Sequence, residues 1–136
     1  QWMGPLEMKG AVKKTLSAGA GGVALTERGT FFGYGNLVVD MRSFREMKAV
    51  CDGPIIFDGT HSVQRPGEGQ GVSGGEPENI PALVRASIAA GADALFLEVH
   101  PEPGTAPSDS TNMMQIDSLQ PLLEQVLAIR SAIGIT

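Results

Sequence analysis

The sequence predicts an α/β fold, a parallel (β/α)8 TIM barrel of which this chain supplies the C-terminal part, with about three strands and four helices. Short, unbroken apolar runs alternate with longer helical patterns, as expected for parallel strands buried on both faces. The segments after these runs are long and polar, as in barrels whose chemistry lies at the C-terminal ends of the strands. Because three strands cannot close such a barrel, we expect residues 1–136 to be the C-terminal portion of one barrel domain, with its N-terminal portion absent from this chain.

The strands are expected where an apolar run shows no polar alternation. These runs are Val23–Thr26, Ile55–Phe57 and Ala94–Leu97, and glycine or proline stands shortly before each of them. The loops that follow them are expected at residues 27–36, 59–75 and 100–112. A doubly wound sheet is the weaker alternative, because no G-x-G-x-x-G motif directly follows a strand.

Four helices are expected, and their ends carry recognisable signals. Pro5 suits the first position of a helix that stops before Gly19. Asp117 is expected to cap the last helix, whose apolar residues form one stripe. The helices are therefore predicted at residues 6–18, 41–50, 77–90 and from Asp117 onward.

The composition excludes several classes of function. The net charge is −5 and the isoelectric point is about 4.9, so no nucleic-acid partner is expected, because that partner needs a basic surface. The single cysteine rules out a disulfide framework and suggests a reducing compartment. The chain has no run of about 18 apolar residues and no secretory leader pattern, so we expect a cytoplasmic protein without a membrane segment.

Ionisable residues follow each predicted strand. Arg28 comes after the first strand, Asp58 and His61 after the second, and Glu98 after the third. Because the carboxyl ends of barrel strands meet at one end of the barrel, these side chains are expected to share a site. His61 and Glu98, together with Asp109 from the last loop, suit a divalent ion such as Zn, Fe or Mn, although their spacing fits no short metal motif.

Each of these residues also has a structural explanation. Arg28 can hold a phosphate or carboxylate through its forked donors, or it can pair with Glu27 or Asp40 at the rim. His61 can be a general base, a metal ligand or a hydrogen-bonded structural residue. Asp109 can bind a metal or make a turn. The residue types alone leave these alternatives open.

Three further features have competing explanations. His100 lies two residues after Glu98, on the same face of an extended segment, and is either a structural partner or a ligand. The glycine-rich segment Gly67–Gly75 lacks the Lys-Ser/Thr of a phosphate-binding loop, so a mobile lid is favoured. Cys51 ends a predicted helix and is expected to be an inert packing residue.

Four stretches occur together in this order: Thr26–Arg42 (TERGTFFGYGNLVVDMR), Pro54–Gln64 (PIIFDGTHSVQ), Ser73–Gly75 and Leu95–Pro103 (LFLEVHPEP). In sequence and spacing they resemble the 3-deoxy-D-manno-octulosonate 8-phosphate (KDO-8-phosphate) synthases, and the likeness covers nearly the whole chain. The 3-deoxy-D-arabino-heptulosonate 7-phosphate synthases share the Glu-Arg-Gly, His-loop and Glu-Val-His-Pro segments. They are not expected to carry the FGYGNLVVDMR segment or the Ser-Gly-Gly lid, so they rank second.

The resemblance implies a barrel enzyme that condenses phosphoenolpyruvate with arabinose 5-phosphate and water, and releases phosphate, for lipopolysaccharide synthesis. It implies catalytic roles for His61, Asp58 and Asp109. Arg28, His61 and Asp58 would bind the substrates, with Arg28 on the phosphate of phosphoenolpyruvate and Asp58 near the sugar. His61, Glu98 and Asp109 would bind a divalent metal (Zn, Fe or Mn), and no organic cofactor is implied.

The resemblance also indicates the metal-dependent branch, because Ser108 stands where metal-independent members tend to have cysteine. In that branch the remaining metal ligand, a cysteine, and the lysines that hold phosphoenolpyruvate belong to the N-terminal part. Cys51 is too far from the strand ends to replace that ligand. Family members assemble as tetramers, so a homotetramer is expected. The alternatives are a heptulosonate synthase that accepts erythrose 4-phosphate and an inactive barrel fragment.

Overall fold

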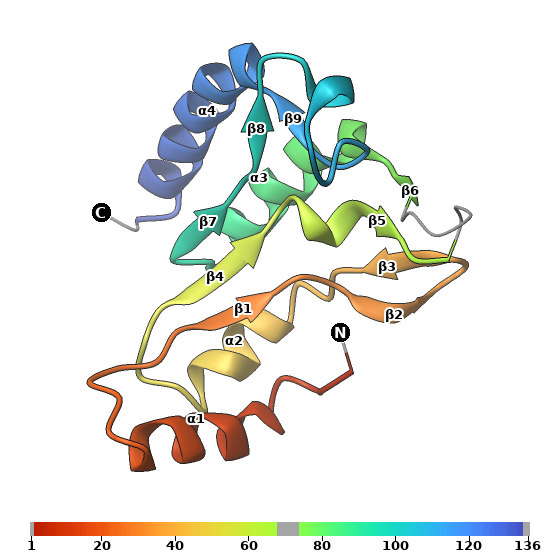
Figure 1. Cartoon of the computed structure of the whole chain (residues 1–136). Coiled ribbons are helices and arrows are strands. Elements are labelled where there is room, and N and C mark those ends of the chain that lie inside the picture. The colour runs from red at the N-terminus through yellow and green to blue at the C-terminus, as the bar shows by residue number, and fades with distance from the viewer. Residues whose placement is uncertain (1, 68–73, 135–136) are drawn as a thin grey trace.

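The fold is built around a small parallel sheet (Figure 1). The computed structural model describes residues 2–67 and 74–134. The sheet has the order β1 (Leu25–Glu27), β4 (Ile55–Asp58), β7 (Ala94–Phe96), and all three strands are parallel. They occupy the three predicted apolar runs, with small shifts at their ends. Their carboxyl ends therefore lie at one edge of the sheet, which confirms the predicted α/β class and strand direction.

Helices flank this sheet, and the part of the chain that the structure describes contains the four α-helices expected: α1 (Met8–Ser17), α2 (Ser43–Lys48), α3 (Ile80–Ala90) and α4 (Leu119–Ala132). α3 ends at Gly91, whose φ of 105° lies in the left-handed region that favours glycine. The expectation that Asp117 caps the last helix is wrong. Asp117 lies in a short 3-10 turn (Ile116–Ser118), and α4 begins after Ser118 without a side-chain cap.

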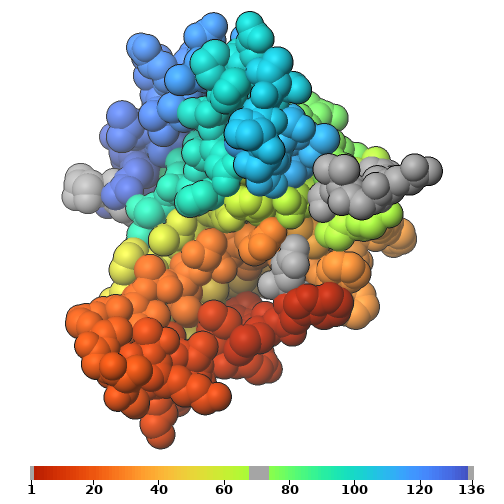
Figure 2. Space-filling view, in the orientation of Figure 1, coloured from red at the N-terminus to blue at the C-terminus, as the bar shows by residue number. Residues whose placement is uncertain are grey.

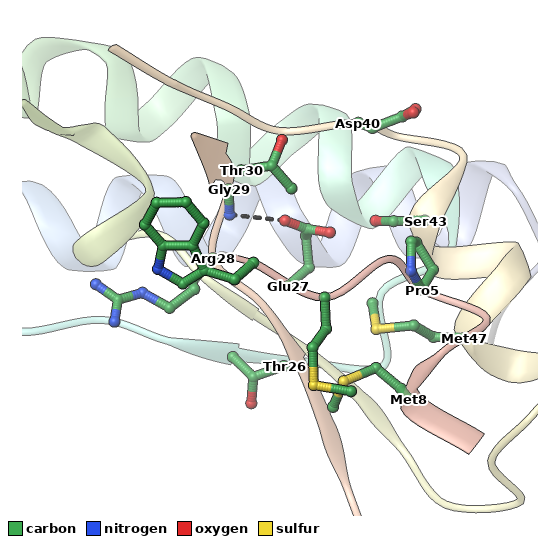
Figure 3. Close-up of a pocket in the computed structure, with 12 residues that line it drawn as sticks. Pro5, Met8, Thr26, Glu27, Arg28, Gly29, Thr30, Asp40, Ser43 and Met47 are labelled. Carbon is green, nitrogen blue, oxygen red and sulfur yellow. Dashed lines mark hydrogen bonds between the residues drawn. The ribbon is translucent and has the colours of Figure 1, made fainter. Parts of the chain in front are cut away.

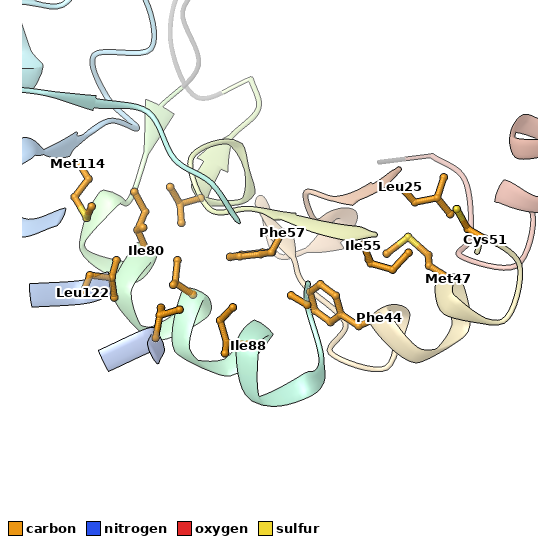
Figure 4. Packing of buried hydrophobic residues seen from close by; sticks show 14 of the residues in the cluster. Leu25, Phe44, Met47, Cys51, Ile55, Phe57, Ile80, Ile88, Met114 and Leu122 are labelled. Atoms are coloured by element: carbon orange, nitrogen blue, oxygen red, sulfur yellow. The ribbon is translucent and has the colours of Figure 1, made fainter. Parts of the chain in front are cut away.

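The hydrophobic core lies between the sheet and the helices that cover it (Figure 4). Ile55 and Phe57 of β4 lie on the same face of the strand and are both fully buried, whereas Ile56, on the other face, is partly buried. The ring of Phe57 meets Phe44 of α2 edge-on at a centroid distance of 6.1 Å. Cys51 is also buried in this cluster, and its Sγ lies 3.4 Å from the carbonyl oxygen of Val23. This confirms its prediction as a packing residue.

A β-hairpin occupies much of the segment 27–36, which the sequence analysis describes only as a loop. Strands β2 (Thr30–Gly33) and β3 (Asn36–Val38) pair antiparallel around Tyr34 and Gly35. Both turn residues have positive φ, 51° for Tyr34 and 90° for Gly35, which suits a tight two-residue hairpin. Trp2 stacks on Phe31 of this hairpin at 4.6 Å and so attaches the N-terminal arm to it.

The other two predicted loops also contain short strands. β5 (Gln64–Arg65) pairs antiparallel with β6 (Gly74–Gly75), and β8 (Val99–His100) pairs parallel with β9 (Met114–Gln115). Each pair joins the two ends of a loop, Gln64 with Gly75 and Val99 with Met114, so each loop folds back on itself after its strand. Residues 68–73 of the predicted lid lie outside the described residues.

In the space-filling view the N-terminal segment, in red, and α4, in blue, lie at opposite ends of the molecule (Figure 2). Residues of β4 and β5, in yellow and green, lie between these ends. Among the described helices, none has the length and apolar character needed to cross a membrane.

Candidate functional site

Three residues from distant parts of the chain meet beyond the carboxyl ends of β4 and β7. His61 Nε2 lies 3.7 Å from Glu98 Oε1 and 3.9 Å from Asp109 Oδ1. The nearest ligand-type atoms of the three side chains all lie within 4.8 Å of one another. All three residues are partly buried. The structure therefore brings together the three predicted metal ligands.

Asp58 holds the imidazole of His61 in one orientation. Its Oδ1 accepts a hydrogen bond from the backbone N–H of His61 at 2.8 Å, and its Oδ2 lies 2.7 Å from Nδ1 of the ring. An ionised carboxylate only accepts hydrogen bonds, so an ionised Asp58 requires the hydrogen on Nδ1 of His61. A neutral ring in that tautomer carries its lone pair on Nε2, the nitrogen that faces Glu98 and Asp109.

Glu98 is positioned through its backbone. Its N–H donates to the hydroxyl of Thr60 at 2.7 Å, and its carbonyl accepts from Met114 N–H at 3.2 Å. Thr60 is fully buried and follows β4, so it joins the ends of two neighbouring strands. Phe96 stacks on the His61 ring at a centroid distance of 5.8 Å and covers one face of it. The side chain of Glu98 thus extends from a backbone that is fixed on both sides.

Asp109 belongs to a tight turn and also faces His61. Its φ of 49° lies in the left-handed region, which Asp tolerates better than most residues. Its carbonyl accepts hydrogen bonds from the N–H groups of Asn112 and Met113, at 2.8 and 3.1 Å. The two alternatives for Asp109, a turn residue and a member of the site, are therefore compatible.

The donor set fits a divalent cation. One neutral imidazole nitrogen and two carboxylate oxygens are ligands that Zn, Fe and Mn accept. Tetrahedral zinc with ligands near 2.1 Å separates those ligands by about 3.4 Å, close to the 3.7 and 3.9 Å measured from His61 Nε2. Both separations are too long for hydrogen bonds, so His61 Nε2 is not hydrogen-bonded to either carboxylate.

Arg28 connects to this cluster through Gln64. Its Nη2 donates to Gln64 Oε1 at 3.0 Å, and Gln64 Nε2 donates to Asp109 Oδ1 at 3.3 Å. The alternative in which Arg28 pairs with Glu27 or Asp40 is wrong in this structure. Glu27 instead accepts the N–H of Gly29 at 2.6 Å, and Asp40 forms an ion pair with Arg42.

A cavity of about 500 Å³ lies on the other side of Arg28, between the N-terminal arm, β1 and α2 (Figure 3). Buried Glu27 and Ser43 contribute to its wall, and the guanidinium of Arg28 extends away from Ser43 and Met47. None of the three clustered residues lines this cavity. The cavity and the cluster are thus separate features that share Arg28 as a neighbour.

Two other predicted candidates lie outside the cluster. His100 Nδ1 accepts the N–H of Glu102 at 3.0 Å, which supports the structural alternative for that residue. Ser73 of the predicted lid is outside the described residues, and only Gly67, Gly74 and Gly75 of its ends are described. Gly75 pairs with Gln64 in the β5–β6 ladder.

The sequence analysis missed two residues that organise the site, Thr60 and Gln64. Both lie within the Pro54–Gln64 stretch. Neither side chain ionises, so the pattern of ionisable residues after the predicted strands does not indicate them. The available sequence signal for Thr60 was its place shortly after the apolar run that forms β4. No local signal predicts the contacts of Gln64, because its partners lie 36 residues before it and 45 residues after it.

Comparison with known proteins identifies the family. The model of the DAHP synthetase I family matches residues 2–133, which is nearly the whole chain. The chain belongs to the DAHP synthetase I family. Among curated relatives of this family member, the 2-dehydro-3-deoxyphosphooctonate aldolase of Cyanothece sp. is 48% identical over 134 residues, covering 98% of this chain and 49% of the relative. The proteins of the same name from Koribacter versatilis and Desulfosudis oleivorans are 48% and 47% identical, covering 98% and 97% of this chain.

The name of these relatives is another name for KDO-8-phosphate synthase, so the comparisons confirm the resemblance inferred from the sequence. The chain spans about half the length of the curated relatives it matches: 49% of the Cyanothece protein, 48% of the Koribacter protein and 47% of the Desulfosudis protein. The matched residues include the three clustered residues, His61, Glu98 and Asp109, and also Asp58, which orients His61.

Proposed function

We propose that this chain is the C-terminal portion of a KDO-8-phosphate synthase. The enzyme would condense phosphoenolpyruvate with arabinose 5-phosphate and water to give 3-deoxy-D-manno-octulosonate 8-phosphate and phosphate, for lipopolysaccharide synthesis. One observation carries the proposal: the cluster of His61, Glu98 and Asp109 lies at the carboxyl ends of parallel strands. The chain that carries this cluster is 48% identical to the Cyanothece protein, which is named 2-dehydro-3-deoxyphosphooctonate aldolase.

In this proposal His61, Glu98 and Asp109 hold a divalent metal, either Zn, Fe or Mn. A bound metal supplies Lewis-acid chemistry, polarising the aldehyde oxygen or positioning the attacking water. Asp58 keeps the proton of His61 on Nδ1, and this leaves Nε2 free to act as a ligand. Asp58 also lies near the sugar substrate in this assignment, and no organic cofactor is required.

Arg28 binds the phosphate of phosphoenolpyruvate in the proposed reaction. A guanidinium presents several N–H donors in one plane, which matches the oxygens of a phosphate. The link from Arg28 to Asp109 through Gln64 supports a phosphate position near the metal, because three side chains in hydrogen-bond contact span that distance. Arg28 therefore positions the anionic substrate while the metal ligands face the reacting carbons.

We further propose that the complete enzyme is a (β/α)8 barrel. The parallel β1–β4–β7 sheet supports this, since within the described residues β1 and β7 each pair with a strand on one side only. By family resemblance, the N-terminal half supplies a cysteine ligand and the lysines that bind phosphoenolpyruvate. A cytoplasmic homotetramer is the proposed assembly on the same basis.

A second candidate is the heptulosonate reaction, with erythrose 4-phosphate as acceptor, because the matching family model carries that enzyme's name. The two are separated by measuring phosphate release with each aldose, using this chain supplied with the N-terminal half of the Cyanothece relative. Release with arabinose 5-phosphate alone supports the proposal. Release with erythrose 4-phosphate alone supports the second candidate, and no release with either supports an inactive fragment.

The metal assignment is tested on the chain itself by Mn²⁺ titration. His61→Ala and Glu98→Ala should each weaken Mn²⁺ binding at least tenfold, because each removes one ligand of a small donor set. His100→Ala and Glu102→Ala are matched controls, since they remove an imidazole and a carboxylate outside the cluster, where His100 Nδ1 accepts the backbone N–H of Glu102. Equal Mn²⁺ affinity in the wild type and both site variants would contradict the assignment.

A further inference from the structure

Gln64 lies between two groups of the proposed site. Its Oε1 accepts from Arg28 Nη2 at 3.0 Å, and its Nε2 donates to Asp109 Oδ1 at 3.3 Å. That same oxygen of Asp109 faces His61 Nε2 at 3.9 Å. The amide therefore contacts the candidate phosphate-binding residue on one side and a candidate metal ligand on the other.

The chemistry of the two neighbours determines the orientation of the Gln64 amide. Arg28 offers only donors, and an ionised Asp109 offers only acceptors. The amide of Gln64 presents an acceptor to the first and a donor to the second at the same time. A rotated amide would place its NH2 against the guanidinium and its oxygen against the carboxylate, so both contacts would become repulsive.

The backbone around Gln64 fixes this arrangement. Gln64 pairs with Gly75 in the β5–β6 ladder. A Cβ at Gly75 would overlap Asn112 Oδ1 and lie 2.6 Å from the carbonyl oxygen of Thr111, so glycine lets the ladder pack closely on this turn. Asn112 is buried, and its N–H donates to the carbonyl of Asp109. The ladder that carries Gln64 and the turn that carries Asp109 therefore form one packed unit.

We propose that Gln64 is a positioning residue that orients the Asp109 carboxylate toward the metal and couples this ligand to Arg28. The inference rests on the proposed function, since it requires that His61, Glu98 and Asp109 bind a cation. Arg28 polarises the Gln64 amide, which strengthens the hydrogen bond that the amide donates to Asp109. Changes at Arg28 therefore reach the metal through Gln64, although Arg28 is not itself one of the ligands.

The experiment measures Mn²⁺ affinity and the visible absorption spectrum of bound Co²⁺ in the full 136-residue chain. Gln64→Met keeps the length of the side chain and removes both hydrogen bonds, so Mn²⁺ affinity should fall about 10-fold and the Co²⁺ spectrum should change. Arg28→Met should weaken Mn²⁺ binding about 3-fold. In the Gln64→Met background, Arg28→Met should have no further effect, because the relay is already broken.

Gln125→Met is the matched control, since Gln125 Oε1 accepts from Arg85 Nη1 at 2.9 Å on an exposed helical surface. It should leave both readouts unchanged, and Arg85→Met should do the same. Circular dichroism checks that each variant folds. If Gln64→Met does not fold, the Arg28→Met variant alone tests the relay, because it leaves Gln64 in place.

The outcomes separate this inference from the proposed function. If His61→Ala weakens Mn²⁺ binding while Gln64→Met and Arg28→Met do not, the metal centre stands and the role of Gln64 is overturned. If Arg28→Met has the same effect with and without Gln64, the coupling is overturned. If the wild-type chain binds no Mn²⁺ even when it is supplied with the N-terminal half of the Cyanothece relative, the metal centre itself is overturned, and the inference with it.

Discussion

Thr60 offers a nearly isosteric test of how the site is supported. The side chain is fully buried, and its hydroxyl accepts the Glu98 N–H at 2.7 Å. Thr60→Val keeps the branched shape and replaces the acceptor with a methyl group. The N–H of Glu98 then loses the acceptor that the buried Thr60 hydroxyl provides. We therefore expect the substitution to destabilise the fold and to loosen the backbone that carries Glu98.

The size of the effect follows from the cost of an unpaired buried donor, which is about 1–3 kcal/mol. With a urea m-value of about 2 kcal/mol/M, a loss of 2 kcal/mol lowers the unfolding midpoint by about 1 M. Urea unfolding followed by circular dichroism measures this shift. Mn²⁺ titration of the same variant should show weaker binding, because Glu98 is one of the three clustered ligands.

Thr15→Val is the control for this substitution. The Thr15 hydroxyl donates to the Ala11 carbonyl on the exposed face of α1, so its loss leaves no buried group unpaired. Threonine and valine have similar helix propensities, so the free energy of unfolding should change by only a few tenths of a kcal/mol. If the two variants differ by less than about 0.5 kcal/mol, Thr60 does not support the site as described.

Two further predictions concern the core and the opposite end of the sheet. Phe57→Ala should lower the free energy of unfolding by about 3–5 kcal/mol in urea, because it leaves a cavity beside a fully buried strand, whereas exposed Phe32→Ala should change it by less than about 0.5 kcal/mol. Burial favours a higher pKa for Asp93, but hydrogen bonds from Ile55 N–H and Lys48 outweigh this and lower that pKa. The stabilisation by ionised Asp93 is therefore complete near neutral pH and is lost as the pH falls below about 4. Asp93→Asn should be less stable than the wild type at pH 7, and urea unfolding at pH 3 should show a smaller difference; an equal difference at both pH values would refute this.

The sequence predicted the sheet and helices well because their signals are local. A continuous apolar run such as Ile55–Phe57 identifies a strand covered on both faces, and glycine at the end of α3 marks the helix end. The β2–β3 hairpin was missed because its turn requires positive φ at Tyr34, a residue type that rarely adopts it. The two-residue pairs β5–β6 and β8–β9 depend on contacts between distant segments, which no local pattern records.

The site was predicted in part for a similar reason. His61 and Glu98 follow strands that are parallel, so their meeting at one edge follows from the topology. Asp109 lies far along the loop after the third predicted strand, not at the end of that strand. It reaches His61 because Met114 pairs with Val99, and this pairing folds the intervening loop back over β7. The same long-range folding brings Gln64 between Arg28 and Asp109, so these contacts became visible only in the structure.

The cluster combines one locally determined group with two that depend on the tertiary fold. Asp58 orients His61 from three residues away, so the direction of Nε2 is set within one segment of chain. Glu98 and Asp109 bring two negative charges toward the lone pair of that nitrogen. Without a cation the two carboxylates, when both are ionised, repel each other. The hydrogen bond that Gln64 donates to Asp109 offsets part of that repulsion, and the Thr60 hydroxyl accepts the N–H of Glu98 and so fixes the backbone of that residue. A divalent ion at the centre of the cluster converts the repulsion into attraction, and an ion that binds only the folded chain also stabilises it. The residues that hold the ligands in place before the ion binds reduce the cost of organising the site, which is why an amide and a hydroxyl belong to the site as much as the residues that ionise.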